Sequence, residues 1–516
     1  MVKTPELEIA DPATGTHAEN AVPTSGGFFG HPRGLATLFF TEFWERFSYY
    51  GMRALLTLFM TASVAQGGLG FATERAGAIY GLYTAFVYLL ALPGGWLADR
   101  LLGQRRAVFL GGCIIAAGHF SMAINSVQTF FLGLVLIVVG TGLLKPNISA
   151  MVGELYPEGG ARRDAGFSIF YMGINLGAFI APLVCGPLGE KVNWHLGFAA
   201  AGIGMVLGLV QYAFGGKYLG SAGLRPNAGE DPAARSSALR ILIGATAVGI
   251  AFVALVWMGV IRLPVEKLAN GTGIIILSLA LLYFVFQLVG GGLDGLEKKK
   301  MLAIFVLFLF SALFWSGFEQ AGSSLTLFAR DLTDRVIFGW EMPVSVLQSV
   351  NPLFIIAFAP VFAWLWLRLR RHEPSAPAKF SLGLILLGLG FGVMVWASMV
   401  ATAGAPGTPG NGQTLKVSPL WLVMTYLFHT FGELCLSPVG LSTVTKLAPH
   451  RKVSQLMGIW FMSIALGNLI AGLVAGQFEK FPLPQLFGAV FATTAGAGLL
   501  LALLIKPIRR LMGNVH

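Results

Sequence analysis

Apolar stretches of about twenty residues or more alternate with short polar connections along most of the chain. A stretch of this length spans the hydrocarbon core of a bilayer as a helix. Charged clusters and Gly, Pro and Asn residues divide the chain into fourteen such stretches. Their expected ranges are 35–63, 75–98, 106–124, 128–150, 165–187, 194–216, 240–261, 271–293, 301–328, 344–368, 379–402, 418–445, 453–478 and 484–506. The pattern therefore predicts an all-α polytopic membrane protein.

The polar stretch 217–240 is the longest one inside the chain, and it separates six predicted helices from eight. Two of those eight precede the sequence EKKK at 297–300, and six follow it. This layout suggests two six-helix bundles joined by an inserted helical hairpin, as in transporters that bind substrate between repeated halves. The expected parts are a disordered cytoplasmic tail (1–32), an N-terminal bundle (33–218), a cytoplasmic linker (219–239), the hairpin (240–296) and a C-terminal bundle (297–510).

Composition supports a lipid-facing surface, because 55% of the residues are hydrophobic and only 11% are charged. Soluble proteins carry about a quarter charged residues. The net charge of +11 does not indicate nucleic-acid binding, since the basic residues form short clusters between apolar runs. Of the 35 lysines and arginines, 24 fall on the side of the chain ends and 8 on the other. This asymmetry predicts that both termini are cytoplasmic.

Neither the N-terminus nor the cysteines indicate processing or metal chemistry. The first thirty residues lack the basic start and apolar core of a cleavable signal peptide. Cys113, Cys185 and Cys435 lie inside apolar runs without metal-ligand spacing, so we interpret them as small packing residues. No metal site is expected.

The first predicted helix contains charges in the sequence TEFWERFSYYGMRALL. Glu42, Glu45, Arg46, Tyr49 and Arg53 recur three or four residues apart and share one face, about 16 Å long. Ionisable groups inside the membrane are costly, and they face a cavity or a partner. Glu42 and Arg46 could simply form an internal ion pair. Arg53 has no acidic residue three or four positions away, so it needs a partner or ligand elsewhere.

A second set of polar residues is spread over other helices. Lys145 ends the fourth, Glu319 lies in the ninth and Glu433 in the twelfth, while Asn175 and Asn351 add amides. Lys145 could instead extend to the membrane interface, and the two amides could serve only to bridge helices. The first half thus supplies Arg53 and Lys145, and the second supplies two carboxylates.

A cavity between these halves would be cationic on one wall and anionic on the other, which suits a small zwitterion. Aromatic residues with polar tips could line apolar pockets there, although each could also be ordinary helix packing. These aromatic residues are Tyr49, Tyr50, Tyr88, Trp315 and Trp460.

Four motifs together resemble the proton-dependent oligopeptide transporter family of the major facilitator superfamily. Residues 42–50, EFWERFSYY, are similar to its first-helix motif, and 94–103, GGWLADRLLG, to the loop motif after helix two. Residues 167–179, FSIFYMGINLGAF, and 432–442, GELCLSPVGLS, are similar to motifs in the fifth helix and in a late core helix. The motifs lie in both halves, and bacterial members of the family also have the inserted helix pair.

This resemblance implies a proton-coupled symporter that imports di- and tripeptides across the bacterial inner membrane. We expect it to function as a monomer, with protons as the coupling ion and no cofactor. Arg53 and Lys145 would face the peptide carboxylate, and Glu433, Asn175 and Asn351 its amino end. The other implied binding residues are Tyr49, Tyr50, Tyr88, Trp315, Ser437 and Trp460. Glu42, Glu45, Arg46 and Glu319 would be linked to protons.

With the site empty, two ion pairs are expected to close the halves on the outer side, namely Arg53–Glu319 and Lys145–Glu433. One family feature is missing, because Gly81 stands where many mammalian-type members have a proton-linked histidine. A drug or anion transporter of the same superfamily is the alternative. An enzyme is not expected, since the sequence has no HExxH, phosphate-binding loop or His/Cys cluster.

Overall fold

The computed structural model describes residues 27–513 apart from 159, 225, 227–231, 261–263, 370–371 and 404–414. The expected helical class is confirmed in this part of the chain, where the named strands are the short pair β1 (Val336–Ile337) and β2 (Trp340–Glu341). Among the described residues, twelve helical segments are long and apolar enough to cross a membrane. The charged α1 and the more polar α4 are two further long helices, which gives the expected fourteen. Most of the predicted disordered tail lies outside the described residues.

The N-terminal bundle has six membrane-spanning segments. They are α1 (Arg33–Thr61), α2 (Thr73–Leu89) continued by α3 (Ala91–Leu97) and η2 (Ala98–Leu102), α4 (Gln104–Met122), α5 (Val127–Glu154), α6 (Gly160–Pro187) with η3 (Leu188–Val192), and α7 (Trp194–Gly215). The short turns η1 (Val64–Gln66) and η4 (Gly216–Leu219) flank them.

The C-terminal bundle also has six segments. They are α10 (Gly295–Phe318) with η5 (Glu319–Gly322) and α11 (Ser324–Asp331), η6 (Val344–Ser349) with α12 (Val350–Leu369), α13 (Ala376–Thr402), α14 (Leu420–Leu447), α15 (Val453–Ala475), preceded by η8 (His450–Lys452), and α16 (Leu483–Met512). Asp294 and Glu297 begin α10 with a reciprocal capping box.

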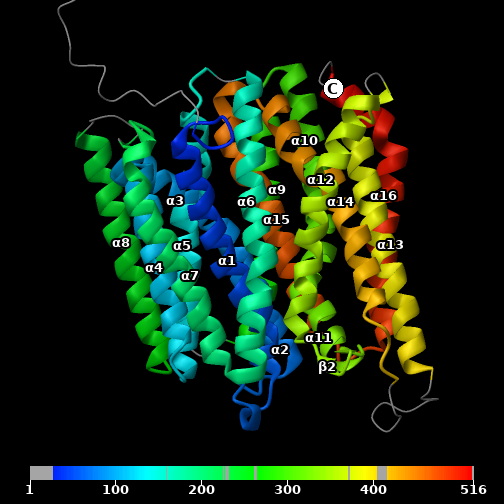
Figure 1. The fold of residues 1–516 in the computed structure, drawn as a ribbon. Helices are drawn as coiled ribbons and strands as arrows, with labels where there is room; N and C mark the ends of the chain where they lie inside the picture. The colour runs from blue at the N-terminus through cyan, green and yellow to red at the C-terminus, as the bar shows by residue number, and fades with distance from the viewer. Residues whose placement is uncertain are drawn as a thin grey trace, which may run out of the picture.

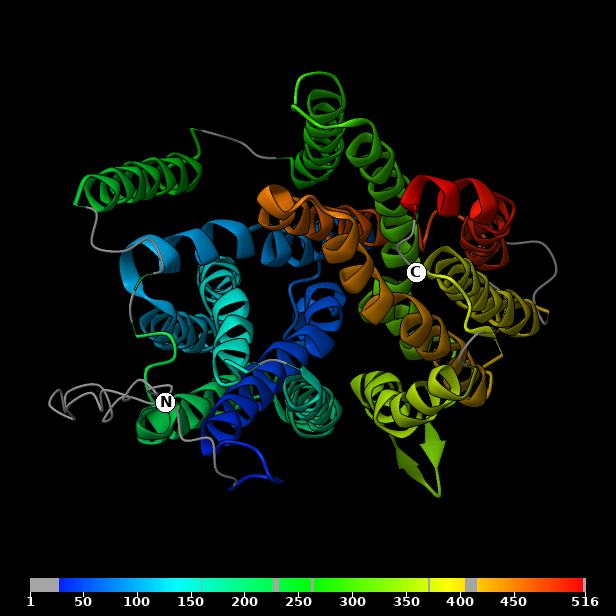
Figure 2. The same cartoon turned by 90° about the horizontal axis from the view of Figure 1, so that it is seen from above.

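The two bundles lie side by side, with α2 packed on α15 and α6 on α12 (Figure 2). α1 begins and α16 ends on the same side of the molecule (Figure 1). We call this the inner side and the opposite one, where β1 and β2 lie, the outer side.

The inserted pair consists of α8 (Pro232–Trp257) and α9 (Val265–Val289). α8 therefore begins within the stretch expected to be linker, part of which lies outside the described residues. α9 packs against α2, α10 and α15, whereas α8 stands apart beside η2 (Figure 2). In the most hydrophobic part of α8, no residue is buried inside the protein. Lipid must therefore cover the apolar surface of this helix.

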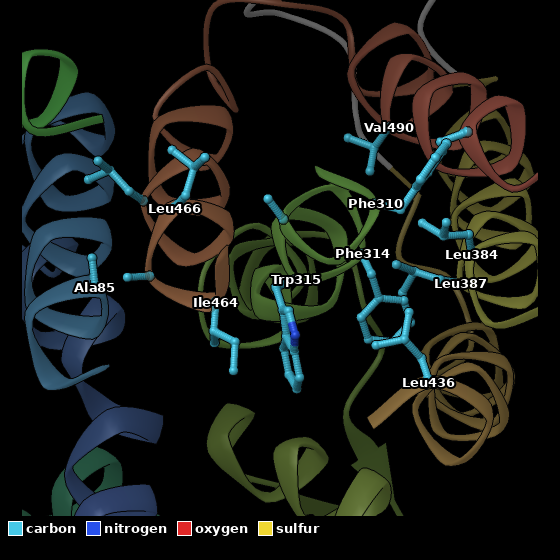
Figure 3. Packing of buried hydrophobic residues seen from close by; sticks show 14 of the residues in the cluster. Ala85, Phe310, Phe314, Trp315, Leu384, Leu387, Leu436, Ile464, Leu466 and Val490 are labelled. Atoms are coloured by element: carbon cyan, nitrogen blue, oxygen red, sulfur yellow. The ribbon is translucent and has the colours of Figure 1, made fainter. Parts of the chain in front are cut away.

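Buried apolar side chains fill each bundle and continue across their interface. The largest cluster joins α10, α13, α14 and α16 and reaches α2 through Ala85. Figure 3 shows Phe314 and Trp315 on neighbouring faces of α10, with Phe314 beside Leu387 and Leu436. This packing holds η5, which follows α10 directly, at the boundary between the bundles.

Candidate functional site

The charged face of α1 forms a buried cluster in the N-terminal bundle. Arg46 Nε lies 3.2 Å from Glu42 Oε1 and also pairs with Glu45. The Arg46 guanidinium lies 5.2 Å from the ring centre of Tyr49. All three charged side chains are buried. The expected internal pair of Glu42 with Arg46 is therefore present, and Glu45 shares it.

This cluster is not fully satisfied within the described part of the protein. Glu42 Oε2, Glu45 Oε1 and Arg46 Nη2 have no hydrogen-bond partner there. Glu42 and Glu45 share the Arg46 guanidinium, and the Lys145 ammonium also interacts electrostatically with both carboxylates. A proton on either carboxylate would supply a hydrogen-bond donor to this cluster.

Arg53 lies further along α1 and connects the two bundles. Its Nη2 is 2.6 Å from Glu319 Oε2, and its Nε donates a 2.7 Å hydrogen bond to the Tyr80 hydroxyl. The Arg53 and Glu319 side chains are 7% and 6% exposed. One turn further along, the Thr57 hydroxyl donates to the Gly322 carbonyl at 2.7 Å. The expected Arg53–Glu319 ion pair is thus formed between α1 and η5.

Lys145 is only half-buried, and its ammonium lies 4.2 Å from the ring centre of Tyr88. Pro146 interrupts the backbone hydrogen bonds of α5 at this point, because proline has no N–H. The carbonyl that loses its helical donor is that of Gly142, and the Asn147 side chain donates to the next carbonyl, that of Leu143, at 2.6 Å. The sequence Lys-Pro-Asn therefore places a cation on a locally opened helix.

Glu433 lies on α14 in the C-terminal bundle and is also half-buried. Asn351 of α12 donates to Glu433 Oε2 at 3.3 Å and to the Thr430 hydroxyl at 3.0 Å. The amide thus connects the start of α12 to α14 and leaves much of the carboxylate free for another donor.

The expected pair between Lys145 and Glu433 is a wrong prediction for this conformation. Lys145 forms no ion pair among the described residues, and it faces Tyr88 instead. The reason is that the ion pairs and hydrogen bonds between α1 and the C-terminal bundle lie at Arg53 and at residues nearer the outer side. Lys145 and Glu433 remain partly exposed, and each keeps a partner from its own bundle.

The other expected site residues occupy different environments. Tyr50 is half-buried with its ring 5.5 Å from the Arg53 guanidinium, whereas Tyr49 is buried and stacks on Tyr83. Asn175 donates to the Tyr171 carbonyl on its own helix at 3.0 Å.

The surroundings of Trp315, Trp460 and Ser437 also differ from one another. Trp315 Nε1 has no partner among the described residues. Trp460 packs on Phe380 and Gly440 inside the C-terminal bundle. Ser437 is half-buried one turn beyond Glu433.

Sequence reasoning missed two members of this site. Tyr80 is uncharged and so does not stand out in an apolar stretch. It lies three residues before Tyr83 and eight before Tyr88 on α2, and this helical spacing could have indicated that it shares their face. Thr430 lies three residues before Glu433 on the same face of α14. Its contact with Asn351 depends on how α12 packs against α14, which the sequence does not reveal.

The outer ends of the bundles are joined by polar contacts. The Glu190 carboxylate accepts backbone N–H groups of Val344 and Ser345 at 2.7 and 2.8 Å. Its neighbour Lys191 pairs with Glu341 of β2 at 3.0 Å. We call these five residues the outer latch. Outside the membrane-spanning segments, the hydrogen bond from Lys191 and the nearby Arg335 hold the pKa of Glu341 below its ordinary value.

Further contacts close the same side. Lys480 pairs with Glu74 at 2.6 Å, and Arg330 donates to the Thr61 hydroxyl at 2.6 Å. Ser349 donates to the Phe179 carbonyl at 2.7 Å. Together with Arg53–Glu319, these contacts join the bundles on the outer side, whereas the half-buried Lys145 and Glu433 form no ion pair between the bundles among the described residues.

Gly81 lies where α2 crosses α15. A Cβ atom there would lie 3.0 Å from the Leu469 carbonyl oxygen and 3.2 Å from Gly472 Cα. These are tight contacts with backbone, so a histidine does not fit in this closed arrangement. Within the described residues, no group of three His, Cys, Asp or Glu side chains is arranged to hold a metal ion.

Comparison with known proteins gives consistent matches over nearly the whole chain. The model of the POT family (PTR2) matches residues 105–490. The chain is 44% identical to the peptide transporter YePEPT of Yersinia enterocolitica, covering 96% of this chain and 99% of that protein. It is 39% identical to a di-/tripeptide transporter of Lactococcus lactis, covering 96% and 100%. A crystal structure of a peptide transporter POT in complex with sulfate has a TM-score of 0.86 at 44% identity, covering 96% and 98%.

Proposed function

The chain belongs to the POT family, and we propose that it imports di- and tripeptides together with protons across a bacterial inner membrane. The observation that supports this most directly is the distribution of charge at the boundary between the bundles. The N-terminal bundle supplies Arg53 and Lys145, and the C-terminal bundle supplies Glu319 and Glu433. A peptide is a zwitterion whose two charged ends match these opposite walls.

In this proposal the peptide carboxylate binds the cations of the N-terminal bundle. Lys145 contacts the Tyr88 ring and forms no ion pair within hydrogen-bonding distance among the described residues, although it interacts electrostatically with Glu42 and Glu45. Arg53 becomes available when its pair with Glu319 opens. The peptide ammonium binds Glu433, which Asn351 orients through its amide. Charge-assisted hydrogen bonds of this kind are about twice as strong as neutral ones, so they fix the direction of the peptide.

Side-chain specificity would come from amphipathic aromatic residues near these charges. Tyr50 lies beside Arg53, Tyr88 beside Lys145, and the Trp315 indole N–H is unsatisfied. Such groups offer an apolar face together with a polar tip, which suits small peptides of varied sequence. Asn175, Ser437 and Trp460 are secondary candidates. Within the described residues, none of them forms a hydrogen bond with these charged side chains.

Protons would act on the same ion pairs that hold the bundles closed. Protonation of Glu319 removes the charge that binds Arg53 and frees the guanidinium for substrate. The cluster of Glu42, Glu45 and Arg46 offers a second proton site, because its two carboxylates share one cation. Coupling follows if proton and peptide favour the same rearrangement, since each ligand shifts the equilibrium by its differential affinity.

The structure is closed on the outer side, and alternating access requires a second state in which those contacts open. Lysines and arginines are more frequent in the connections on the inner side than on the outer side. This unequal distribution supports a cytoplasmic inner side, with both termini there. Protease access to a terminal tag in intact cells tests this orientation, and cleavage from outside would contradict it. We further propose that a monomer suffices, because both walls of the site come from one chain.

Substrate binding by purified protein tests the assignment of Arg53. Replacing Arg53 with Ala removes a charge-assisted hydrogen bond and should weaken dialanine binding about tenfold to a hundredfold. Arg240→Ala on the exposed surface of α8 is the matched control and should bind normally. Unchanged affinity in Arg53→Ala protein would refute the role proposed for this residue.

A further inference from the structure

A cavity of about 680 Å³ lies at the inner end of the C-terminal bundle, and neither Arg53 nor Glu433 lines it. The segment before α13, α13 itself, α14 and the end of α16 form its walls. The residues that line it are Glu373, Pro374, Ser375, Ala376, Lys379, Pro438, Val439, Ser442, Thr443, Lys446 and Arg509. Nothing in the transport scheme uses this cavity.

Positive charge exceeds negative charge in this cavity. Lys379 is 7% exposed, pairs with Glu373 at 2.5 Å and lies 4.5 Å from the Trp366 ring centre. Lys446 and Arg509 have no acidic partner among the described residues. Three cations therefore surround one carboxylate, and two of them are free to bind an anion.

Neutral donors accompany these cations. Ser375 precedes the 27-residue helix α13 and makes no capping hydrogen bond with its side chain. The Ser375 hydroxyl lines the cavity and is therefore available as a donor. Ser442 and Thr443 of α14 add two hydroxyl groups. Hydroxyl, ammonium and guanidinium donors around one space suit a phosphate group, which offers several acceptor oxygens.

The surroundings favour a phosphate that belongs to a lipid. Trp364 at the inner end of α12 is exposed, and the Arg368 guanidinium lies 5.2 Å from its ring centre. Leu367 beside them is also exposed. Exposed Trp next to Arg is typical of the membrane–water interface. The cavity therefore lies near the level of the lipid headgroups, and Pro438 and Val439 give it an apolar wall.

We propose that this cavity binds the headgroup of an anionic phospholipid, with Lys446 and Arg509 contacting the phosphate. Basic pockets between helices on the cytoplasmic side of membrane proteins are suited to such headgroups. The buried Lys379–Glu373 pair would hold the wall of the site in place. This inference does not depend on the transported substrate.

Native mass spectrometry of the full chain in non-ionic detergent, titrated with phosphatidylglycerol, tests the proposal. The double variant Lys446→Gln/Arg509→Gln should bind this lipid about thirty-fold more weakly, as expected for two charges near a membrane surface. The matched control Lys506→Gln/Arg510→Gln removes the same charge from exposed positions of α16 outside the cavity and should bind normally. Lipid binding and the midpoint of thermal unfolding are also measured for each single variant. An unchanged midpoint shows that weaker lipid binding does not result from misfolding.

The other outcomes would overturn the proposal. Equal weakening in both double variants would mean that lipid follows general surface charge and not the cavity. Equal binding of phosphatidylcholine would show that the net negative charge is irrelevant. Displacement of the lipid by millimolar inorganic phosphate would identify the ligand as a free anion.

Discussion

At the scale of single residues, Arg53 has two kinds of partner with different chemistry. Glu319 supplies a charge that a proton can remove, and Tyr80 supplies a neutral oxygen that persists. Opening the ion pair therefore does not leave the guanidinium without any acceptor. This arrangement lowers the cost of releasing Arg53 inside the membrane, because an entirely unpaired buried charge is the expensive case.

Glu319→Gln tests this account through stability. The variant removes the charge opposite Arg53, and the closed state should lose about 3 kcal/mol, because breaking one side of a buried pair leaves the other uncompensated. Thermal unfolding of purified protein measures the loss. Glu158→Gln, which removes an exposed carboxylate 3.8 Å from Arg162, should change stability by less than about 1 kcal/mol. Equal midpoints for the two variants would show that the Arg53–Glu319 pair does not stabilise the closed state.

At this scale, the sequence alone singled out most of the charged residues of the candidate site. Charges inside apolar stretches are costly, so Glu42, Arg53, Glu319 and Glu433 could be selected from one chain without coordinates. Their partners were harder to predict. Whether Lys145 pairs with Glu433 depends on the distance between α5 and α14, which differs between the conformations of a transporter. One sequence is compatible with all of these conformations, so it cannot indicate in which of them the pair forms.

At the scale of helices, the crossing of α2 and α15 depends on small residues. Gly77 and Gly81 of α2 face Gly472 of α15 so closely that backbone meets backbone. Small residues permit such an approach in membranes, where packing contributes much of the association of helices. This crossing joins the two bundles and lies on the side of the site nearer the outer latch.

Gly81→Ala should weaken this crossing. The added Cβ would lie 3.0 Å from the Leu469 carbonyl oxygen, and overpacking against backbone costs about 1–3 kcal/mol. Gly496→Ala in α16 adds the same group where no atom lies within 4 Å, and it should be neutral or slightly stabilising. Spin-label distances between outer helix ends report the change. A Gly81→Ala distribution identical to that of the control would argue against the close crossing.

The outer latch has a defined pH dependence. Lys191 and Arg335 hold the pKa of Glu341 below its ordinary value, so this carboxylate is ionised at neutral pH. Its contribution to closure is present above the ordinary glutamate pKa of about 4.3 and is lost as pH falls through the lowered value. The difference in outer distances between the original protein and Glu341→Gln should therefore stay constant from pH 8 to pH 5. A difference that vanished within this range would contradict the assignment.

Helix positions were predicted well, and the packing of the inserted pair was not. Apolar stretches longer than a bilayer core define α8 and α9 unambiguously. Apolar surfaces on all sides give no preferred partner in lipid, however, so periodicity could not reveal that α9 joins the α2–α15 interface while α8 stands apart. The latch was also missed, because Glu190 contacts backbone N–H groups that have no sequence signal.

At the scale of the whole molecule, the contacts that close the outer side and the residues of the proposed peptide site lie along the same boundary between the two bundles. The outer contacts, the Arg53–Glu319 pair and the half-buried Lys145 and Glu433 follow one another from the outer side inward. In the proposed mechanism, neutralising a carboxylate at this boundary would therefore affect both closure and peptide binding. In the same mechanism, the cluster of Glu42, Glu45 and Arg46 would give the N-terminal bundle a proton site of its own.

Uptake of labelled dialanine into proteoliposomes tests the central claim most directly. With an inward proton gradient, the original protein should accumulate peptide above the external concentration, and without the gradient it should only equilibrate. Glu45→Gln should abolish gradient-driven accumulation while retaining most peptide counterflow, whereas Glu158→Gln should retain both. Failure to accumulate any of several di- and tripeptides under the gradient would contradict proton-coupled peptide import.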